Sequence, residues 1–361
     1  MRIVIAGGGT GGHVMPALAL VEELRRRDPQ LFLRWVGKRG SLEERMAARH
    51  NIPFVPVSVT SWVGKPWHTR VLGLSALGFG ILKSAEMLLR FRPQIVVGVG
   101  GYASFPTVWA AQRLGFKTAL LEQNVALGFA NRILAARATR IFLSYSPLEK
   151  YPFSDKIRVF GNPIRGAFRN PPPRDEARRR WGLNLSDPVV LVVGGSQGSA
   201  RINEAVAGAT HHLADQSLQW LWMTGPSANH YRERVTPSAR LQIFEFIEDM
   251  VSAYAAADVV ICRAGASTLA ELAAVGVPAI LVPYPHAAEG HQMHNALRFV
   301  EAGAARIVSD AECTAERLAR EIETLLASPE SLAAMRERMH ALAAPHAAED
   351  IASEIISLVF A

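Results

Sequence analysis

The sequence has little cysteine: Cys262 and Cys313 are the only two among 361 residues. Neither belongs to a C-x-x-C pair or to another spacing that is typical of metal ligands. A disulfide scaffold and a zinc site are therefore not expected. Clusters of the Asp-x-Asp kind are also missing, so no carboxylate pair is evident that could hold a divalent cation.

Long uninterrupted hydrophobic runs are missing as well. The longest apolar stretch, Val71 to Leu89, is broken by glycine, serine and charged residues, whereas a spanning helix needs about 20 mostly apolar residues. The first residues, Met1 to Ala6, lead directly into glycines, which is typical of a buried strand and not of a signal peptide. We therefore expect a cytoplasmic protein without a transmembrane segment.

The composition is that of a globular protein with a basic surface. Hydrophobic residues make up 49% and charged residues 20% of the chain, which excludes a disordered or fibrous class. The formal net charge is +7 and the pI is near 9.7. This charge fits nucleic acid or an anionic membrane surface as a partner, and it fits a solvated basic surface equally well.

A chain of this length predicts two domains. Short β-branched runs alternate with helical patterns, which is typical of parallel α/β sheets. Helices such as Val14–Arg27 and Ser104–Leu114 separate the strands expected in the first half, which are Arg2–Ala6, Leu31–Val36, Phe54–Val59, Ile95–Val99 and Thr118–Glu122. A second series of expected strands comprises Pro188–Val193, Leu218–Thr224, Leu241–Phe246, Val259–Cys262, Ala279–Val282 and Ala305–Val308. Glycine and proline between the series place the boundary near residues 163–173.

The predicted architecture is a pair of Rossmann-like domains. In such sheets ligands bind at the carboxyl ends of the strands, which here predicts a cleft between the domains. A last amphipathic helix over Ala348–Val359 follows Pro345 and must dock on the rest of the chain.

Three glycine-rich loops follow expected strands. The first, Gly7–His13, contains G-x-G-x-x-G before a helix that begins near Val14, and a helix N-terminus suits phosphate. An NAD site would need an acidic residue after the second strand, where the sequence has Lys38 and Arg39. Among dinucleotides only NADP remains as a candidate, because these two cations could bind its additional phosphate. The other two loops are Gly98–Tyr102 and Gly194–Ser199. Three anion-binding loops together suit two phosphorylated ligands. Any single loop could instead be a tight turn with a purely structural role.

The second half adds a compact group of polar residues. Arg263–Glu271 joins a strand to a helix, so its amides can face a diphosphate. Glu271 follows Thr268 by three residues, which suits a capping box or a carboxylate that accepts both ribose hydroxyls. Gln292 and Asn295 share one face of a helix start, either as surface amides or as sugar ligands.

Taken together, these segments resemble the MurG family of peptidoglycan glycosyltransferases, in glycosyltransferase family 28. The resemblance runs almost end to end. It rests on Gly7–His13 with Pro16, Gly100–Tyr102, Glu122–Asn124, Gly161–Arg165, Gly194–Gly198, Phe246–Ile247, Arg263–Glu271, His291–Gln292 and Asn295–Ala296. It implies a GT-B fold and inverting transfer of N-acetylglucosamine (GlcNAc) from UDP-GlcNAc to the muramyl 4-hydroxyl of lipid I, giving lipid II.

The resemblance also implies roles for single residues. Ile247, with Phe246 beside it, would present backbone to the uracil, and Glu271 would hold the ribose hydroxyls. The diphosphate would meet Arg165, Ser196 and the turn formed by Ala266, Ser267, Thr268, Leu269 and Ala270. Gln292 and Asn295 would read the GlcNAc hydroxyls, and Thr10, Gly11, Gly12 and Asn124 would complete the donor site. The candidate catalytic residues are His13, as general base or as a hydrogen-bonding group, and Asn124. The acceptor diphosphate would contact Gly11, Gly12, Gly100, Gly101 and Tyr102.

The implied organisation assigns residues 1–163 to an acceptor and membrane-facing domain, onto which residues 345–361 pack back, and residues 164–344 to UDP-GlcNAc binding. No cofactor or metal is expected, because helix N-termini and Arg165 can stabilise the departing diphosphate. The expected partners are UDP-GlcNAc, lipid I, an anionic membrane surface and a wall-synthesis protein complex, with no nucleic acid. The expected location is peripheral, on the cytoplasmic face of the bacterial plasma membrane.

The membrane contact is expected in the segment Trp62–Arg90, where apolar side chains accompany cations. These are Trp62, Trp67, Leu72, Leu74, Leu77, Phe79, Ile81 and Leu82 with Lys65, Arg70, Lys83 and Arg90. An ordinary packed helix is the alternative. Related transferases that act on diacylglycerol, UDP-GlcNAc 2-epimerases and non-catalytic membrane scaffolds remain as other functions. Departures from the family pattern, at Ser199 and at Ala287–Gly290, are peripheral.

Overall fold

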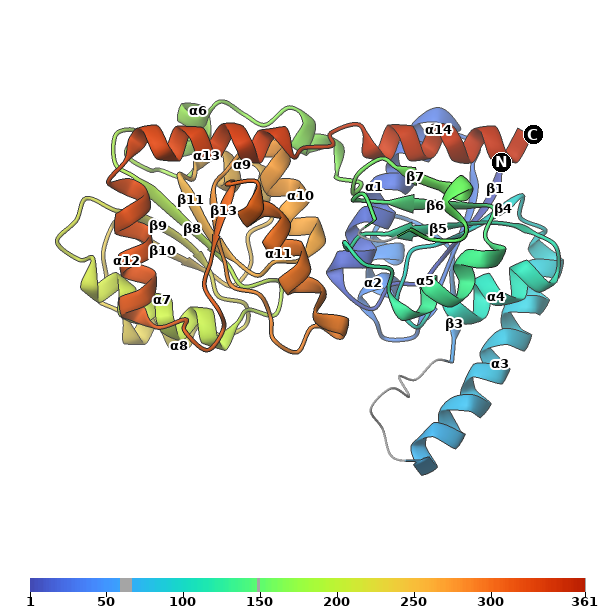
Figure 1. Cartoon of the computed structure of the whole chain (residues 1–361). Helices are drawn as coiled ribbons and strands as arrows, with labels where there is room; N and C mark the ends of the chain where they lie inside the picture. The colour runs from blue at the N-terminus through green and yellow to red at the C-terminus, as the bar shows by residue number, and fades with distance from the viewer. Residues whose placement is uncertain (59–66, 148–149, 361) are drawn as a thin grey trace. The chain divides into compact units, whose positions relative to one another are not determined.

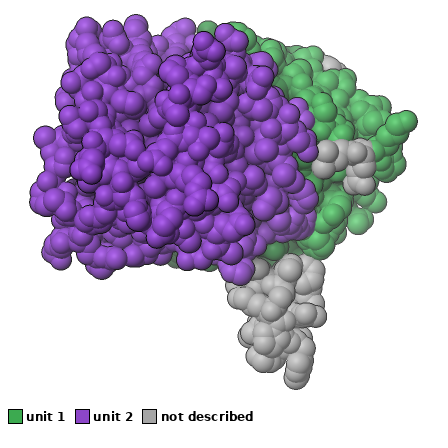
Figure 2. Space-filling model, turned by 60° about the vertical axis from the view of Figure 1, so that its left-hand side comes forward, with its two compact units in different colours: residues 1–165, 344–361 green, residues 166–343 purple. Residues whose placement is uncertain are grey.

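The computed structural model describes residues 1–58, 67–147 and 150–360, and of residues 67–74 it describes the backbone alone (Figure 1). The chain forms two compact units, which Figure 2 distinguishes by colour. Unit 1 comprises residues 1–165 and 344–361, and unit 2 comprises residues 166–343. Unit 2 is thus an insertion between the body of unit 1 and its last helix.

Unit 1 is built on a seven-stranded sheet in the order β3-β2-β1-β4-β5-β6-β7, and every pair of neighbouring strands is parallel. Its strands are β1 (Arg2–Ala6), β2 (Phe32–Lys38), β3 (Phe54–Val57), β4 (Ile95–Gly98), β5 (Lys117–Glu122), β6 (Arg140–Leu143) and β7 (Ile157–Val159). Its helices are α1 (Gly11–Arg27), α2 (Leu42–Arg49), α3 (Trp67–Phe91), α4 (Phe105–Arg113), α5 (Phe129–Leu134) and α14 (Ala347–Phe360), with short 3₁₀ turns at Ala135–Arg137 and Ser154–Lys156.

Helices cover both faces of this sheet, because its central strands are apolar on both sides. On one face α1 and α14 pack against the sheet, and Ile351 and Ile355 of α14 are completely buried there with Leu18 and Leu20 of α1. On the other face α3 and α4 contribute buried residues such as Leu88 and Val108. Helix α14 therefore completes the core of unit 1 on this face of the sheet (Figure 1).

Unit 2 has a six-stranded parallel sheet in the order β10-β9-β8-β11-β12-β13. Its strands are β8 (Val189–Val193), β9 (Gln219–Met223), β10 (Leu241–Phe244), β11 (Val259–Cys262), β12 (Ala279–Leu281) and β13 (Ala305–Ile307). Its helices are α6 (Arg174–Arg180), α7 (Ala200–His212), α8 (Ala228–Arg234), α9 (Met250–Ala256), α10 (Ala266–Val275), α11 (His291–Glu301), α12 (Ala315–Leu326) and α13 (Pro329–Ala341), with 3₁₀ turns η3 (Gly166–Arg169) and η4 (Ala288–Gly290).

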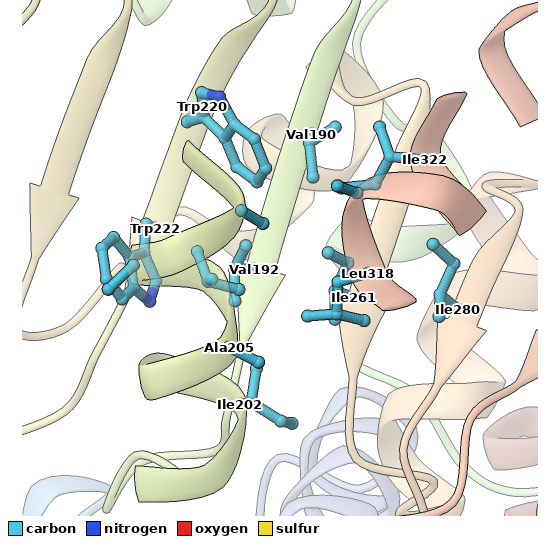
Figure 3. Packing of buried hydrophobic residues seen from close by; sticks show 14 of the residues in the cluster. Val190, Val192, Ile202, Ala205, Trp220, Trp222, Ile261, Ile280, Leu318 and Ile322 are labelled. Atoms are coloured by element: carbon cyan, nitrogen blue, oxygen red, sulfur yellow. The ribbon is translucent and has the colours of Figure 1, made fainter. Parts of the chain in front are cut away.

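The core of unit 2 fills the space between this sheet and the helices α7 and α12 (Figure 3). Val190 and Val192 of the central strand β8 are buried beside Trp222 of β9. Leu318 and Ile322, one turn apart on α12, close the other side of the cluster. The period of the apolar residues in each element thus matches the surface that the element buries.

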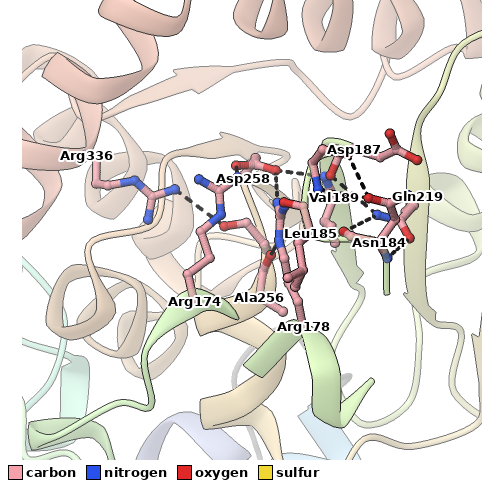
Figure 4. Close-up of polar contacts among 12 residues, drawn as sticks. Arg174, Arg178, Asn184, Leu185, Asp187, Val189, Gln219, Ala256, Asp258 and Arg336 are labelled. Carbon is pink, nitrogen blue, oxygen red and sulfur yellow. Dashed lines mark hydrogen bonds and ion pairs between the residues drawn. The ribbon is translucent and has the colours of Figure 1, made fainter. Parts of the chain in front are cut away.

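An ion-pair cluster around the buried Asp258 and Arg178 lies at the amino ends of β8 and β11 in unit 2 (Figure 4). Asp258, which precedes β11, accepts hydrogen bonds from Val189 N at 2.8 Å, from Arg178 Nη2 at 2.6 Å and from Arg174. Arg178 is 1% exposed and also donates to the carbonyl oxygens of Leu185 and Ala256. This end of the sheet is therefore fixed, and the opposite end carries the candidate site.

The parallel two-domain fold class predicted from the sequence is confirmed, and two details differ. Helix α1 begins at Gly11 and not near Val14, because Thr10 takes the N-cap position with extended backbone angles. Strands β6 and β7 were not expected from the sequence. Among the described helices, none combines the length and the apolar composition needed to cross a membrane.

Candidate active site

In each sheet the chain order reverses at one point, and the loops there diverge. In unit 1 this point lies between β1 and β4, whose ends Ala6 and Gly98 are register partners. In unit 2 it lies between β8 and β11, where Val193 is paired with Cys262. Ligands of open α/β sheets bind at such points, beyond the carboxyl ends of the strands. The three glycine-rich loops and the Arg263–Glu271 turn all start there.

The first two glycine loops pack directly on each other in unit 1. A Cβ atom at Gly7 would lie 2.3 Å from the carbonyl oxygen of Gly100, and a Cβ at Gly101 would lie 2.3 Å from that of Gly8. All four glycines have positive φ angles, which L side chains rarely adopt. Glycine is therefore required at these positions by the close approach of the two backbones.

The N–H groups of the first turn are used inside the protein. Gly7 N donates to Val36 O at 2.9 Å, and Gly8 N donates to Gly100 O at 3.2 Å. Gly9 N donates to the Glu43 carboxylate at 2.9 Å. The N–H groups of Gly7, Gly8 and Gly9 are therefore not available to an anion, which is compatible with the anion site predicted at Gly11 and Gly12.

His13 lies in the first turn of α1, beside both loops. Its Nδ1 is 3.1 Å from Thr10 Oγ1. Its ring lies against the second loop, because a Cβ at Gly100 would be 2.7 Å from His13 Cδ2. Thr10, Gly11, Gly12 and His13 thus form one continuous group at the start of the helix.

Asn124 follows β5 and is held by the buried carboxylate of Glu122, which is 2% exposed. One oxygen of Glu122 accepts from Asn124 N and from Asn124 Nδ2, both at 3.1 Å. The other accepts from Gly128 N and from Asn131 Nδ2, both at 2.9 Å. Glu122 therefore positions Asn124 and the start of α5. The neighbouring side chain, Gln123, donates to Val99 O and supports the second loop.

The second loop presents Tyr102, whose side chain is 39% exposed. Ser104 supports this loop by donating from Oγ to Gly101 O at 2.8 Å. Gly100, Gly101 and Tyr102 thus lie in a fixed turn beside the first loop.

The third loop, in unit 2, differs from the first. Gly198 is packed against Thr224, since a Cβ there would lie 2.0 Å from the carbonyl oxygen of that residue. Ser196 is exposed. Within the part of the chain that the structure describes, the N–H groups of Gly195, Ser196 and Gln197 have no protein acceptor. This loop can therefore offer backbone N–H groups to an anion.

Arg263 connects several loops of unit 2, a role that was not expected from the sequence. Its guanidinium donates to Ser199 Oγ at 2.8 Å, to Asp310 Oδ1 at 2.6 Å and to Val282 O at 3.0 Å. Ser199 in turn caps α7 by accepting from Ile202 N. Arg263 thus joins the third loop to the loops after β12 and β13, through contacts between segments that are far apart in the sequence.

Helix α10 presents its N-terminus at the same edge of the sheet. It begins at Ala266 with Gly265 as N-cap, and its first turn, which includes Ser267 and Thr268, contains no acidic residue. Thr268 is therefore the third helical residue and not the cap, so the capping-box interpretation of Glu271 is wrong. Glu271 lies one turn further along, followed by the buried Leu272, and is partly buried.

The loop after β10 places Phe246 and Ile247 differently. The Phe246 side chain is 55% exposed, whereas that of Ile247 is 1% exposed. Ile247 N lies 3.3 Å from the thioether sulfur of Met223, which is a weak acceptor. The backbone of Ile247 is therefore held by an interaction that a better acceptor could replace.

Gln292 and Asn295 lie on one face of α11 but have different surroundings. Gln292 Oε1 accepts from Tyr284 N at 2.9 Å and fixes the loop after β12. Asn295 is 0% exposed, and its Nδ2 lies 3.4 Å from Ala264 O, just before α10. Asn295 Nδ2 therefore contacts the turn that starts α10. Arg165 is the last residue of the first segment of unit 1. It immediately precedes η3, which packs on α10.

Comparisons with known proteins cover almost the whole chain. Models of the glycosyltransferase family 28 N-terminal and C-terminal domains match residues 3–143 and 189–355. The UDP-N-acetylglucosamine–N-acetylmuramyl-(pentapeptide) pyrophosphoryl-undecaprenol N-acetylglucosamine transferase of Anaeromyxobacter sp. (strain K) is 39% identical, over 99% of this chain and 93% of the relative. The transferase of the same name from Bacteroides fragilis is 37% identical, over 99% and 96%.

Solved structures agree with the sequence matches. The crystal structure of Acinetobacter baumannii MurG matches with a TM-score of 0.81 at 28% identity and covers 99% of both chains. The GT-B fold and the family resemblance predicted from the sequence are thereby confirmed. The chain belongs to glycosyltransferase family 28.

Proposed function

We propose that this protein transfers GlcNAc from UDP-GlcNAc to the muramyl 4-hydroxyl of lipid I, with inversion at the anomeric carbon, and so forms lipid II. The observation that carries the proposal is in unit 2, where the acid-free N-terminus of α10 and the carboxylate of Glu271 lie on one helix at the switch point. A helix N-terminus suits a diphosphate, and a nearby carboxylate can accept hydrogen bonds from ribose hydroxyls. The names of the relatives supply the sugar and the acceptor.

The donor binds through unit 2 in this proposal. The N–H groups of Ala266, Ser267 and Thr268 at the start of α10 face the diphosphate, with Ser196 and Arg165 as further donors. Leu269 and Ala270 complete this turn, and Leu269 N donates within it to Gly265 O at 3.0 Å. Glu271 accepts hydrogen bonds from the ribose hydroxyls. The N–H group of Ile247, which donates to the Met223 sulfur in the structure, donates to the uracil instead. Gln292 contacts the GlcNAc, and Asn295 supports the turn at Ala264 and completes the GlcNAc site.

Unit 1 supplies the groups for the acceptor. The 4-hydroxyl oxygen forms a bond to the anomeric carbon, and the bond from that carbon to the UDP oxygen breaks. His13 accepts the hydroxyl proton at Nε2. This requires the tautomer in which Nδ1 is protonated, and its N–H group then donates a hydrogen bond to Thr10 Oγ1. Negative charge develops on UDP, where helix N-termini and Arg165 stabilise it.

Asn124 acts as a second catalytic group in this scheme. Glu122 holds it through both its backbone and its amide, so its side chain is presented in one orientation. Glu122 itself has both oxygens engaged by four N–H donors and serves as a positioning group. Gly11 and Gly12, with Gly100, Gly101 and Tyr102 of the second loop, bind the acceptor diphosphate.

The acceptor is a lipid, and we place the protein at the cytoplasmic face of the plasma membrane. In the described part of α3, Phe79 and Leu82 are 72% and 68% exposed and are followed by the exposed Lys83. The opposite side of the helix packs on α4, where Ser84 and Thr107 share a buried hydrogen bond of 2.9 Å. Exposed apolar side chains beside cations suit an anionic membrane surface.

Part of the expected membrane segment is outside these observations. Trp62 and Lys65 lie outside the described residues, as do the side chains of Trp67, Arg70, Leu72 and Leu74. The proposed membrane surface therefore consists of Phe79, Leu82, Lys83, Leu89 and Arg90, which are exposed.

The deciding experiment is an acceptor competition with purified protein and UDP-GlcNAc labelled in the sugar. Label should move to lipid I and not to diacylglycerol. Transfer to diacylglycerol would assign the protein to the other class of transferase. Conversion of the donor sugar without any acceptor would indicate an epimerase.

A further inference from the structure

Glu43 is a buried carboxylate behind the first glycine turn. It belongs to the first turn of α2 and is 0% exposed. Its Oε2 accepts from Gly9 N at 2.9 Å, and its Oε1 accepts from Lys38 N at 3.0 Å. Among the described residues, no Lys, Arg or His pairs with it. Burying a carboxylate without a cation is costly, so these two contacts call for an explanation.

Two glycines make room for this side chain. A Cβ atom at Gly8 would lie 2.7 Å from Glu43 Cδ, and a Cβ at Gly37 would lie 2.6 Å from Glu43 Cγ. Both distances are shorter than real Cβ contacts. Gly8 is therefore needed for the approach of Glu43 and of the second loop, and not for the approach of a phosphate.

The contact at Gly9 leads directly to the proposed base. Gly9 precedes Thr10, which is the N-cap of α1 and whose Oγ1 is 3.1 Å from His13 Nδ1. The His13 ring rests against Gly100. A displacement of Gly9 would therefore move Thr10 and change how the His13 ring is held.

We propose that Glu43 is a positioning residue for the transfer reaction, which fixes the Gly7–Gly9 turn and through it the start of α1 and His13. This inference rests on the proposed function and deepens it. Glu43 contacts no reacting atom in this scheme. It acts by keeping Gly9 N and Lys38 N in one place, so that Thr10 and His13 keep their geometry.

Glu43→Gln tests the proposal with little change in shape. The amide can accept from Gly9 N or from Lys38 N, but its own NH₂ must then face the other N–H group, which loses its acceptor. We expect kcat to fall about 10-fold or more, since small misplacements of reacting groups are costly in rate. KM for UDP-GlcNAc should stay within about twofold, because the donor binds through unit 2.

Glu44→Gln is the matched control. Glu44 is the next residue of α2, and its carboxylate accepts from Gly40 N without contacting the first turn. Its kcat and KM should match those of the unchanged protein. Thermal unfolding of both variants separates loss of rate from loss of folded protein, because a merely structural role for Glu43 would lower the melting temperature and leave kcat of the folded enzyme unchanged.

Amide hydrogen exchange over residues 7–13 gives a readout that does not depend on activity. The Gly9 amide should be protected in the unchanged chain and in Glu44→Gln, and should exchange at least about 10-fold faster in Glu43→Gln. If the unchanged protein fails to form lipid II, the proposed function fails, while this measurement still tests the contact.

Two results would overturn the proposal: unchanged kcat in folded Glu43→Gln, or unchanged exchange at Gly9. Should Glu43→Gln not fold, Glu43→Asp replaces it. Aspartate keeps the charge but is one methylene shorter, so it cannot reach both N–H groups. It must then lower kcat with KM retained, and an unchanged kcat in this variant also contradicts the proposal.

Discussion

Two glycine-rich turns of similar composition differ in where their backbone N–H groups point. In the first turn Gly7, Gly8 and Gly9 donate to Val36, Gly100 and Glu43. In the third, Gly195, Ser196 and Gln197 are exposed and, within the described residues, donate to no protein acceptor. At the scale of single residues, the third loop and the start of α10 are therefore better suited than the first turn to bind the phosphates of a donor.

Replacement of His13 by alanine tests its role as the base. His13→Ala should fold and bind UDP normally, because alanine suits the first turn of α1 and the donor binds through unit 2 in the proposed scheme. Turnover should fall about 100-fold or more, as expected for the loss of a general base. Steady-state rates across the pH range, together with UDP binding by calorimetry, check this. Unchanged turnover at every pH would remove His13 from the mechanism.

Glu271 gives the sharpest prediction at this scale. A carboxylate that accepts from both ribose hydroxyls should make the enzyme discriminate against 2′-deoxy-UDP-GlcNAc by about tenfold or more, since a charged hydrogen bond contributes about 1.5–3 kcal/mol. Glu271→Gln should reduce this discrimination while uridine selectivity remains. The measurement is the ratio of kcat/KM for the two donors in each protein.

The melting temperature of Glu271→Gln serves as the control. Thr268 is not the N-cap of α10, so removal of the Glu271 charge should change stability little. An unchanged donor ratio combined with a lower melting temperature would assign Glu271 to a structural role and contradict the ribose contact.

The sequence identifies the loop residues of the candidate site, because glycine turns before helices have a local pattern. It does not identify Glu43 and Arg263 as the residues that hold these loops. Glu43 contacts Gly9 across 34 residues, and Arg263 contacts Ser199 across 64 residues. Contacts of this kind depend on the strand order of each sheet, which a local pattern does not contain.

At the scale of elements, α1 and α14 are joined by a charged network. Glu23 of α1 is 2% exposed and accepts from Arg26 and Arg27, and Arg27 also donates to Ser353 of α14. The hydrogen bond from Arg26 is the main reason that the pKa of Glu23 is lowered from 4.5 to about 2. Ionised Glu23 therefore stabilises the folded state.

This shift predicts a pH-dependent effect of Glu23→Gln. A lowered pKa contributes stability that is fully present above about pH 4.5 and is lost as the pH falls toward 2. Near pH 7 the variant should lose about 2 kcal/mol of unfolding free energy, the size of a charged hydrogen bond. The difference from the unchanged protein should shrink below pH 4.5. Denaturant unfolding at several pH values measures it.

The exposed Glu22 provides the control for this prediction. Glu22→Gln removes the same charge from the same helix but leaves the contacts of Glu23 in place. A loss of equal size in both variants would show that net charge, and not the contacts of Glu23 with Arg26 and Arg27, is responsible.

The elements themselves differ in how far the sequence predicts them. The central strands β1, β4, β8 and β11 are short runs of mostly apolar residues, and their positions follow from the sequence. Strand β7 covers only Ile157–Val159 at the sheet edge, and its pairing to β6 is set by tertiary contact. The start of α1 at Gly11 is also set by packing, since glycine by itself disfavours a helix.

At the scale of the whole molecule, substitutions in α3 test the proposed membrane surface. Replacing Phe79 and Leu82 by serine and Lys83 by glutamine should reduce binding to anionic vesicles about 10-fold or more, because both apolar area and charge are lost. Co-sedimentation with vesicles of phosphatidylglycerol and phosphatidylcholine measures the effect.

Phe32→Ser is the matched control for this surface. Phe32 is 64% exposed but belongs to β2. Its replacement should leave vesicle binding unchanged. A folded α3 variant that binds vesicles like the unchanged protein would show that the proposed membrane surface is wrong.

The path of the chain through its two units has a consequence for biosynthesis. Ile351, Ala352 and Ile355 belong to the core of unit 1, yet they are translated after all of unit 2. The ribosome therefore releases every residue of unit 2 while the core of unit 1 still lacks one wall. Unit 1, whose synthesis starts before that of unit 2, acquires α14 only after all of unit 2 has been made. Until then the apolar surface that α14 covers must avoid non-native contacts.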